Sequence, residues 1–224
     1  MNTRTALMTT ATLAAALAAS AAHADLQARL GGQAVYDTDM NVTWLANANL
    51  GGQMNWDTAQ GWIAGLNAAK HLGYDDWRLP ATLQPDASCE AQSDTRSAGY
   101  HCTGSEMGHL FYVELGGVAA QSINATHNAN FSLFQNFNDY FYWSGTAYAQ
   151  DANLAWNFLF LGGTQHASYL AGYKGDGMSA LAVRPGDVAA VPEAAPWAQL
   201  LAGLGFVVAA IKRRAQARRQ PGSR

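Results

Sequence analysis

The chain has 224 residues, is 49% hydrophobic and only 13% charged, and carries a formal net charge of −3. That value hides an uneven distribution, because residues 25–191 contain 15 acidic and six basic side chains, a net charge of −9, whereas residues 192–224 contain six basic side chains and one acidic one. Bulk electrostatics therefore exclude nucleic acids and sulfated polyanions as partners of residues 25–191, and leave neutral sugars, cations and proteins. The 167 residues of this segment suffice for one domain with its own core.

The first 24 residues have the pattern of a secretory signal peptide. Arg4 supplies the positive start, residues 6–19 are mostly Ala, Leu, Met and Thr, and Ala22-His23-Ala24 is a small-residue cleavage site. A short buried helix is the alternative, but the flanking residues favour a signal. We therefore expect an exported protein whose mature chain begins at Asp25.

Two strands are expected at residues 34–37 and 42–46, joined by the turn Asp37–Asn41. The D-x-D-x-N spacing of this turn is similar to a calcium loop. Its sixth position is Val42 instead of Gly, however, and its twelfth is Ala48 instead of Glu. A hairpin turn closed by Asx hydrogen bonds is therefore favoured over an ion site.

A helix is expected after Asn55, whose side chain can cap it, with a core-facing stripe at helical spacing. It leads into residues 73–80, which read Gly-Tyr-Asp-Asp-Trp-Arg-Leu-Pro. Residues 77–79 are expected to form a strand that the following proline ends, because proline has no backbone N–H. Two acidic residues precede the arginine, so we expect an ion pair beside a buried tryptophan, and favour structural pairing over catalysis. The stripe is Ala59, Trp62, Ile63 and Leu66, and the structural residues are Asp75, Asp76, Trp77, Arg78, Leu79 and Pro80.

The two cysteines, Cys89 and Cys102, are an even count in an exported chain and predict a disulfide. The bond would close a loop of 14 residues and contribute about 3 kcal/mol in the chain-entropy model. A metal site is excluded, because only His101 lies nearby and four ligands are lacking.

A second helix is expected to begin at a capping box formed by Thr103 and Glu106. Glu106 and His109 are three positions apart and invite an acid–base interpretation, but the capping role already accounts for Glu106. Residues 118–139 are predicted to form a long loop, and strands are predicted at 140–144, 155–161 and 180–184. The strand at 140–144 is expected to lie at the centre of its sheet, because its residues are too apolar to alternate between a buried and an exposed face. The buried face of the second helix is predicted to consist of Met107, Leu110, Phe111 and Leu115.

The C-terminal segment 192–224 contains an apolar stretch, 197–211, followed by a basic tail. Its 15 residues make about 22 Å of helix, which is short for a bilayer core of about 30 Å unless residues 194–196 and snorkelling basic side chains extend it. This end of the chain resembles the PEP-CTERM sorting signal, in its motif Val191-Pro192-Glu193, its apolar span and its basic tail. In bacteria that make exopolysaccharide, a membrane-embedded exosortase recognises and removes that signal. Ala194 departs from that pattern, and a permanent C-terminal membrane anchor is the alternative.

Four stretches share a further pattern: Gly73–Pro80, Cys102–Phe111, Tyr142–Thr146 and Ala182–Gly186. They resemble the Lcl C-terminal domain family, which is largely of unknown function and is named after the tail of a collagen-like bacterial adhesin. The resemblance implies an α+β domain with a C-type lectin-like fold, in which two helices flank a twisted antiparallel sheet, long loops lie on one side and one disulfide is present. It adds Trp143, Ser144 and Arg184 to the structural residues.

The namesake adhesin binds sulfated glycans, but the net charge of −9 opposes that property here. C-type lectins that bind sugars through calcium use Glu-Pro-Asn and Trp-Asn-Asp motifs, and neither occurs in this sequence. We therefore expect neither a metal ion nor a cofactor.

The favoured function is a non-enzymatic surface or matrix protein that binds exopolysaccharide or another glycan through aromatic side chains in loops. The rivals are an enzyme with a formylglycine-generating-like fold and a purely structural envelope protein. An enzyme is disfavoured because no cysteine follows Cys102 and Ser144 lacks a G-x-S-x-G elbow. The loop tyrosines expected to contact a glycan, or else to pack on the core, are Tyr100, Tyr148, Tyr169 and Tyr173.

Overall fold

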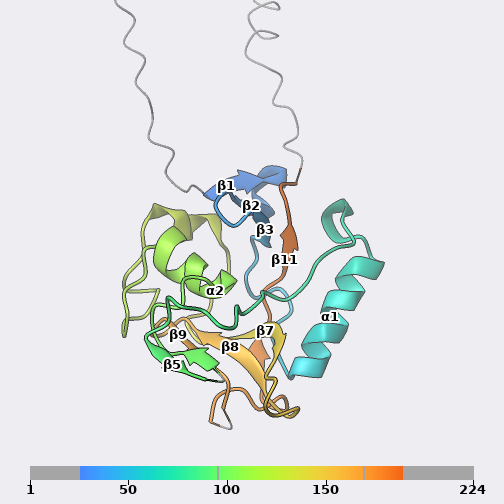
Figure 1. The fold of residues 1–224 in the computed structure, drawn as a ribbon. Coiled ribbons are helices and arrows are strands. Elements are labelled where there is room, and N and C mark those ends of the chain that lie inside the picture. Colours follow the sequence, from blue (N-terminus) through green and yellow to red (C-terminus); the bar gives the residue numbers. More distant parts are fainter. Residues whose placement is uncertain (1–25, 95, 169, 189–224) are drawn as a thin grey trace, which may run out of the picture.

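The computed structural model describes residues 26–94, 96–168 and 170–188, which form one mixed α+β domain (Figure 1). The predicted signal peptide 1–24, the sorting motif Val191-Pro192-Glu193, the predicted span 197–211 and Tyr169 lie outside these residues. Within the described ranges, no helix has the length and apolar character needed to cross a membrane.

The first sheet has four antiparallel strands in the order β1-β2-β3-β11. Oδ1 of Asp37 accepts hydrogen bonds from the backbone N–H groups of Asp39 and Met40, at 3.1 and 2.9 Å, and Asn41 has a φ of 50°. The predicted hairpin and its Asx turn are therefore confirmed. The strands are β1 (Leu26–Arg29), β2 (Ala34–Asp37), β3 (Val42–Leu45) and β11 (Val183–Pro185).

The second sheet has five strands in the order β4-β10-β7-β8-β9, and β7 is central, as predicted. Because β10 runs parallel to β7, the sheet is mixed. The expected single antiparallel sheet is thus wrong: the domain has two principal sheets. The strands are β4 (Gln53–Met54), β7 (Phe141–Ala147), β8 (Ala155–Leu159), β9 (Thr164–His166) and β10 (Met178–Ser179).

The strand expected at 180–184 is divided between the two sheets. β10 ends at Ser179 in the second sheet, and β11 begins at Val183 in the first. The linking residues 180–182 are fully buried, so their apolar character reflects a passage through the core instead of a continuous strand.

The disulfide between Cys89 and Cys102 is present, and it encloses a small hairpin of β5 (Ala91–Ser93) and β6 (Arg96–Ala98). This hairpin is attached to the edge of the second sheet, because Gly99 and Gln165 exchange backbone hydrogen bonds at 3.0 and 2.9 Å. The predicted pairing of the cysteines is confirmed.

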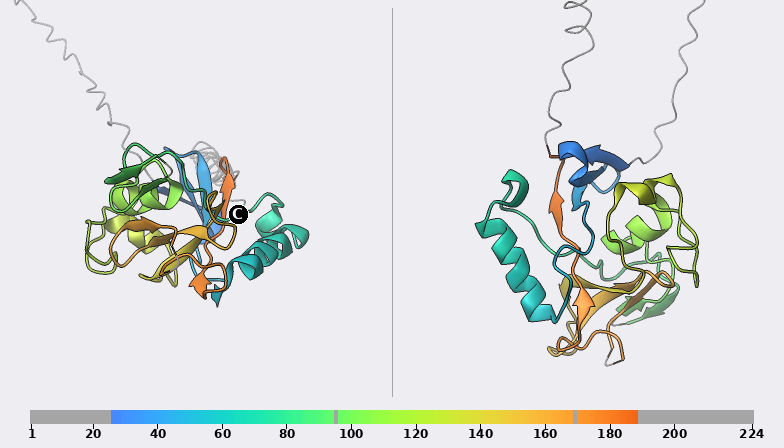
Figure 2. Two further views of the ribbon diagram at one scale, coloured as in Figure 1. Left: turned by 60° about the horizontal axis from the view of Figure 1, so that its bottom comes forward. Right: turned by 180° about the vertical axis from the view of Figure 1, so that it is seen from behind.

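Helix α1 (Trp56–Ala68) begins as predicted, with Oδ1 of Asn55 accepting a hydrogen bond from the N–H of Thr58 at 2.8 Å. Helix α2 (Glu106–His109) is short and continues as the π-helix η3 (Leu110–Glu114). The two helices lie on opposite sides of the domain (Figures 1 and 2). The remaining turns are the 3-10 helices η1 (Leu30–Gly32), η2 (His71–Gly73) and η4 (Ala129–Leu133).

The core has two large halves. One half lies among the first sheet, α2–η3 and the aromatic residues of the second sheet, and it buries the whole predicted face of the second helix. The other half lies under α1, where Ala59 and Ile63 are buried and Trp62 and Leu66 are half-buried. The largest buried side chains are Trp44, Phe111, Tyr142, Phe158 and Phe160 in the first half and Trp77 and Trp143 in the second. Trp156 is buried in a third, smaller cluster with Ala98 and Ala167.

The two ends of the described chain leave from the same end of the domain. β1 and β11 belong to one sheet there, and Nε of Arg29 forms an ion pair with Asp187 at 2.8 Å. The loops 148–153 and 172–177 lie at the opposite end, below the second sheet in Figure 1 and in the right view of Figure 2. The domain therefore has a chain-terminal end and a loop end.

Candidate functional site

Trp77 anchors the segment 73–80 to the end of α1. Its side chain is 2% exposed, and its Nε1–H donates to the carbonyl of His71 at 3.0 Å. The amide of Asn67 holds the backbone of Trp77 on both sides, accepting from its N–H at 2.8 Å and donating to its carbonyl at 2.9 Å. Residues 77–79 are not a full strand as expected, because only Arg78 forms a bridge, with Val183 of β11.

The charged residues of this segment have distant partners, so the expected ion pair within the segment is wrong. Arg184 makes two hydrogen bonds to Asp76, at 2.7 and 2.9 Å, and its guanidinium lies 4.1 Å from the ring centroid of Tyr74. Arg78 pairs instead with Glu106 of α2. Asp75 is exposed, with Lys70 at 3.8 Å. An extended backbone alternates its side chains, which sends neighbouring charges to different elements.

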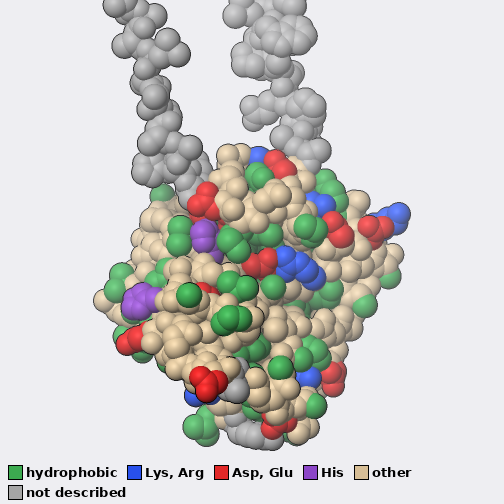
Figure 3. Space-filling view, viewed as in Figure 1, with side chains coloured by type: hydrophobic (Ala, Val, Ile, Leu, Met, Phe, Trp, Pro, Cys, Tyr) green, Lys and Arg blue, Asp and Glu red, His purple; other side chains and the backbone are tan. Residues whose placement is uncertain are grey.

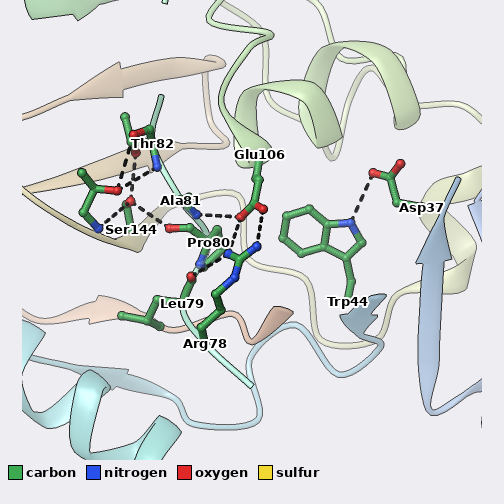
Figure 4. Close-up of polar contacts among 10 residues, drawn as sticks. Asp37, Trp44, Arg78, Leu79, Pro80, Ala81, Thr82, Glu106 and Ser144 are labelled. Atoms are coloured by element: carbon green, nitrogen blue, oxygen red, sulfur yellow. Dashed lines mark hydrogen bonds and ion pairs between the residues drawn. The ribbon is translucent and has the colours of Figure 1, made fainter. Parts of the chain in front are cut away.

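The expected capping box at α2 is also wrong. Glu106 uses its carboxylate to accept hydrogen bonds from Nη1 of Arg78 at 2.7 Å and from the backbone N–H of Ala81 at 2.6 Å (Figure 4). The N-cap position belongs to Ser105, whose hydroxyl accepts from the backbone N–H of Leu83 at 3.0 Å. These long-range partners outcompete the local cap.

The end of the segment is bonded to β7. The carbonyl of Pro80 accepts from the hydroxyl of Ser144 at 2.8 Å, and the hydroxyl of Ser144 accepts from that of Thr82 at 2.9 Å (Figure 4). The backbone N–H of Gly145 also donates to the carbonyl of Pro80, at 2.8 Å. Ser144 is fully buried. It is therefore engaged in structural hydrogen bonds and does not face a cleft as a nucleophile would.

The four stretches that carry the family pattern thus converge on residues 76–81. We call this set of contacts the clasp: it joins α1, α2, β7 and β11 through the residues just described. A pocket of about 260 Å³ adjoins it, which we call the motif pocket. Its lining is Gln60, Arg78, Leu79, Ala81, Gly145 and Thr146.

A second pocket, of about 350 Å³, lies at the loop end, and we call it the loop pocket. Its walls come from the first turn of α1, from loop 148–153 and from loop 172–177, and they are mainly polar. All of its lining residues except Lys174 are exposed. The full lining is Asn55, Asp57, Ala152, Asn153, Tyr173, Lys174 and Gly175.

The loop pocket is held in shape by Lys174. Its Nζ donates to the carbonyl of Ala152 at 2.9 Å and lies 4.2 Å from the ring centroid of Trp56. The backbone N–H of Trp56 bonds to the carbonyl of Lys174 at 3.0 Å, and the indole N–H of Trp56 bonds to the carbonyl of Ser144 at 2.8 Å. Both loops are therefore fastened to α1 and β7.

Among the predicted loop tyrosines, Tyr173 lines the loop pocket and is 45% exposed. A Cβ added at Gly175 would lie 2.6 Å from the Tyr173 ring, so the glycine lets the ring rest on its own loop. Tyr148 is half-buried against Trp156, with ring centroids 5.6 Å apart, and Tyr100 is half-buried near His101. The structure does not group the tyrosines, and Tyr169 lies outside the described residues.

The surface viewed in Figure 3 is mostly uncharged and polar, with hydrophobic side chains in small separate groups. Four of the six basic side chains of residues 26–188 form ion pairs with carboxylates, which leaves little free positive charge for a sulfated ligand. The sequence patterns did not indicate Asp57, Asn153 or Lys174, because these residues meet only when two loops fold against α1. The glycine-rich residues 172–177 indicate a turn but not a pocket.

The disfavoured acid–base pair of Glu106 and His109 is not formed. His109 lies instead against Glu114, with Nε2 and Oε1 3.2 Å apart. Glu106 faces Arg78. Neither His109 nor Glu114 lines the loop pocket or the motif pocket of the described domain.

Comparison with protein families gives one match: the model of the Lcl C-terminal domain fits residues 33–184. No curated protein and no solved structure matches the chain. The matched region runs from just before β2 to the middle of β11 and includes the whole clasp. Since it spans well over half of the sequence, this chain belongs to the Lcl C-terminal domain family.

Proposed function

We propose that this chain is an exported, non-enzymatic surface or matrix protein that binds a neutral glycan in the loop pocket. The carrying observation is the combination of an exposed tyrosine with amide, carboxylate and amino groups around a pocket of about 350 Å³. A tyrosine ring offers an apolar face to a sugar ring. The polar groups offer donors and acceptors to hydroxyls, and pockets with a few convergent polar groups are the usual binding sites.

The position of the loop pocket supports this proposal. It lies at the end of the domain opposite the last residues of β11, from which the chain continues toward the predicted sorting segment. A domain held at the membrane by that segment, before an exosortase removes it, would present the loop pocket away from its attachment. The acidic charge favours neutral exopolysaccharide over sulfated glycans.

The rival enzymatic function lacks comparable support in the described domain. The buried carboxylate Asp37, whose pKa is raised chiefly by burial, lines neither the loop pocket nor the motif pocket. A catalytic carboxylate is expected in a cleft that a substrate can enter. A purely structural envelope role remains the second alternative, and binding measurements separate it from ours.

The test is calorimetric titration of the oxidised mature protein, recovered from the producing cell, with that cell's exopolysaccharide, with and without Ca²⁺. We expect saturable heat in both conditions and at least about tenfold weaker binding for Tyr173→Ala, as for an aromatic hot spot. Tyr140→Ala is the matched control, since Tyr140 is 48% exposed and lies outside the loop pocket.

Gln60→Ala serves as a second comparison, because Gln60 lines the motif pocket. Loss of binding in Gln60→Ala with full binding in Tyr173→Ala would move the site to the clasp. A flat trace for the unaltered protein would remove this glycan and leave the structural role. Mass spectrometry of the mature protein tests sorting separately: exosortase processing predicts that Lys212–Arg224 are missing, and an intact tail would indicate a permanent anchor.

A further inference from the structure

Three titratable side chains from three elements meet in the core beside the β2–β3 turn. Asp37 ends β2, His109 ends α2 and Glu114 ends η3. One ligating atom of each residue lies within 4.8 Å of those of the other two. Asp37 and Glu114 are 0% and 1% exposed, so two carboxylates share an enclosed space with one imidazole.

The π-helix is what brings His109 and Glu114 together. On an α-helix, residues five positions apart point in directions about 140° apart and do not meet. In η3 the N–H of Leu115 bonds to the carbonyl of Leu110 at 2.9 Å, a step of five residues that widens the turn. Such turns are rare and occur frequently at functional sites. The side-chain amides of Asn128 and Asn130 hold the carbonyl of Glu114, at 2.9 and 3.0 Å.

One carboxylate oxygen of Glu114 has no partner. Its Oε2 is buried and makes no hydrogen bond to any described residue, whereas its Oε1 faces His109. A buried, unpaired charged oxygen is costly, and its presence in a folded protein calls for a compensating group. A bound cation would supply one.

The charges of the cluster favour a cation as well. Burial raises the pKa of Asp37, the hydrogen bond from the N–H of Met40 opposes this, and the neighbouring charge of Glu114 raises it further. Burial lowers the pKa of His109, but the hydrogen bond to Glu114 and the charges of Asp37, Glu114 and Asp39 outweigh it, and the pKa is raised overall. Burial is thus the main cause of the raised pKa of Asp37, whereas the raised pKa of His109 reflects the carboxylates around it.

We propose that Asp37, His109 and Glu114 bind a divalent transition-metal ion, Zn²⁺ or Mn²⁺, which fastens the β2–β3 turn to α2 and η3. Imidazole nitrogen suits Zn²⁺ and carboxylate oxygen suits Mn²⁺, and three protein ligands leave a coordination position for water. Oδ2 of Asp37 is available, since its hydrogen bond from the indole of Trp44 is long, at 3.4 Å (Figure 4). The similar cluster of Asp86, Cys89 and Cys102 is excluded because its two sulfur atoms form the disulfide.

The test uses the full-length chain, purified oxidised in detergent without a polyhistidine tag and stripped with a chelator. Zn²⁺ or Mn²⁺ is added, unbound metal is removed by gel filtration, and metal per chain is measured by elemental analysis. We expect about one ion per chain and a raised thermal midpoint. Glu114→Gln and His109→Gln, which remove a ligand at similar size, should weaken binding by more than about 100-fold, since even the partners of metal ligands are worth 10- to 100-fold.

Glu106→Gln is the matched control, because Glu106 is a buried carboxylate on the same helix that is bonded to Arg78. It should retain the ion, and near-UV circular dichroism checks the fold of each variant. Should Glu114→Gln fail to fold, His109→Gln decides alone, since the side chain of His109 is 13% exposed and tolerates replacement better. The proposal would be overturned if the unaltered chain retained no metal. It would also be overturned if both ligand variants retained as much metal as the unaltered chain does.

Discussion

The guanidinium of Arg78 holds the carboxylate of Glu106 through two hydrogen bonds, although 28 positions separate the residues in the chain. The side chain of Glu106 is 10% exposed and that of Arg78 is 38% exposed. A nearly buried carboxylate therefore depends on one partly exposed guanidinium for its countercharge. This pair connects the segment 76–81 to α2 and so completes the clasp.

Removing Arg78 should leave that carboxylate without a countercharge. We expect Arg78→Gln to lower the free energy of unfolding by about 2 kcal/mol. This is less than the roughly 3–5 kcal/mol that breaking a fully buried ion pair usually costs, because solvent reaches the arginine. Urea titration measures the change. Asp75→Asn, at a residue 65% exposed and 3.8 Å from Lys70, should change stability by less than about 0.5 kcal/mol. Equal effects of the two substitutions would refute a stabilising role for the pair.

Local residue patterns predicted those helices, strands and turns that are long enough to contain a recognisable pattern. The stripe from Ala59 to Leu66 specified α1, and the Asx chemistry of Asp37 specified the β2–β3 turn. β4 and β10 have two residues each, too few for alternation to be read from the sequence. β10 in addition pairs in parallel with β7, which depends on where a distant loop returns the chain.

Partners of charged residues could not be predicted for the same reason. Asp76 and Arg184 are 108 positions apart, and only the position of β11 beside the clasp brings them together. The cluster of Asp37, His109 and Glu114 depends on a π-helical turn, which helical spacing of 3.6 residues does not predict. The residues of the family pattern were identified, but their contacts required the fold.

The pair of Asp76 and Arg184 should make stability depend on acidity. The hydrogen bonds from Arg184 lower the pKa of Asp76 below its unfolded value of about 3.9. A lowered carboxyl pKa stabilises the fold above that unfolded value, and the contribution is lost as the pH falls through the folded pKa. We expect Asp76→Asn to be less stable than the unaltered chain at pH 7, and the difference to shrink below about pH 4.

Urea titrations of both proteins at about pH 7 and about pH 3 measure that difference. Asp75→Asn is the comparison, because its exposed carboxylate has only Lys70 nearby and should give a small difference at both acidities. If the stability difference between Asp76→Asn and the unaltered chain were the same at both pH values, the pair would not titrate as argued.

The disulfide should be complete in the oxidised protein and important for its stability. Alkylation of the oxidised protein should label neither Cys89 nor Cys102, and a labelled cysteine would contradict the pairing. Replacing both by serine should cost about 3 kcal/mol, the loop-closure value for a loop of this length. The comparison of unfolding midpoints is made with the oxidised parent, since a reducing agent would alter the parent as well.

Gly108 of α2 should tolerate no side chain, because the chain that leaves the disulfide passes directly over it. A Cβ at this position would lie 1.9 Å from the backbone oxygen of Cys102, which cannot rotate away as a side chain could. We expect Gly108→Ala to destabilise the domain by about 1–3 kcal/mol or more through overpacking. Gly65 in α1 is the matched control, since a Cβ there meets no atom within 4 Å.

The two substitutions should have opposite signs in the same urea titration. Gly65→Ala should raise stability by about 0.5–1 kcal/mol, because alanine restricts the unfolded chain and favours the helix. Gly108→Ala should lower stability in spite of the same gain in helix propensity. A neutral or stabilising effect at Gly108 would mean that α2 can move away from Cys102, and the tight junction between the disulfide and the helix would have to be abandoned.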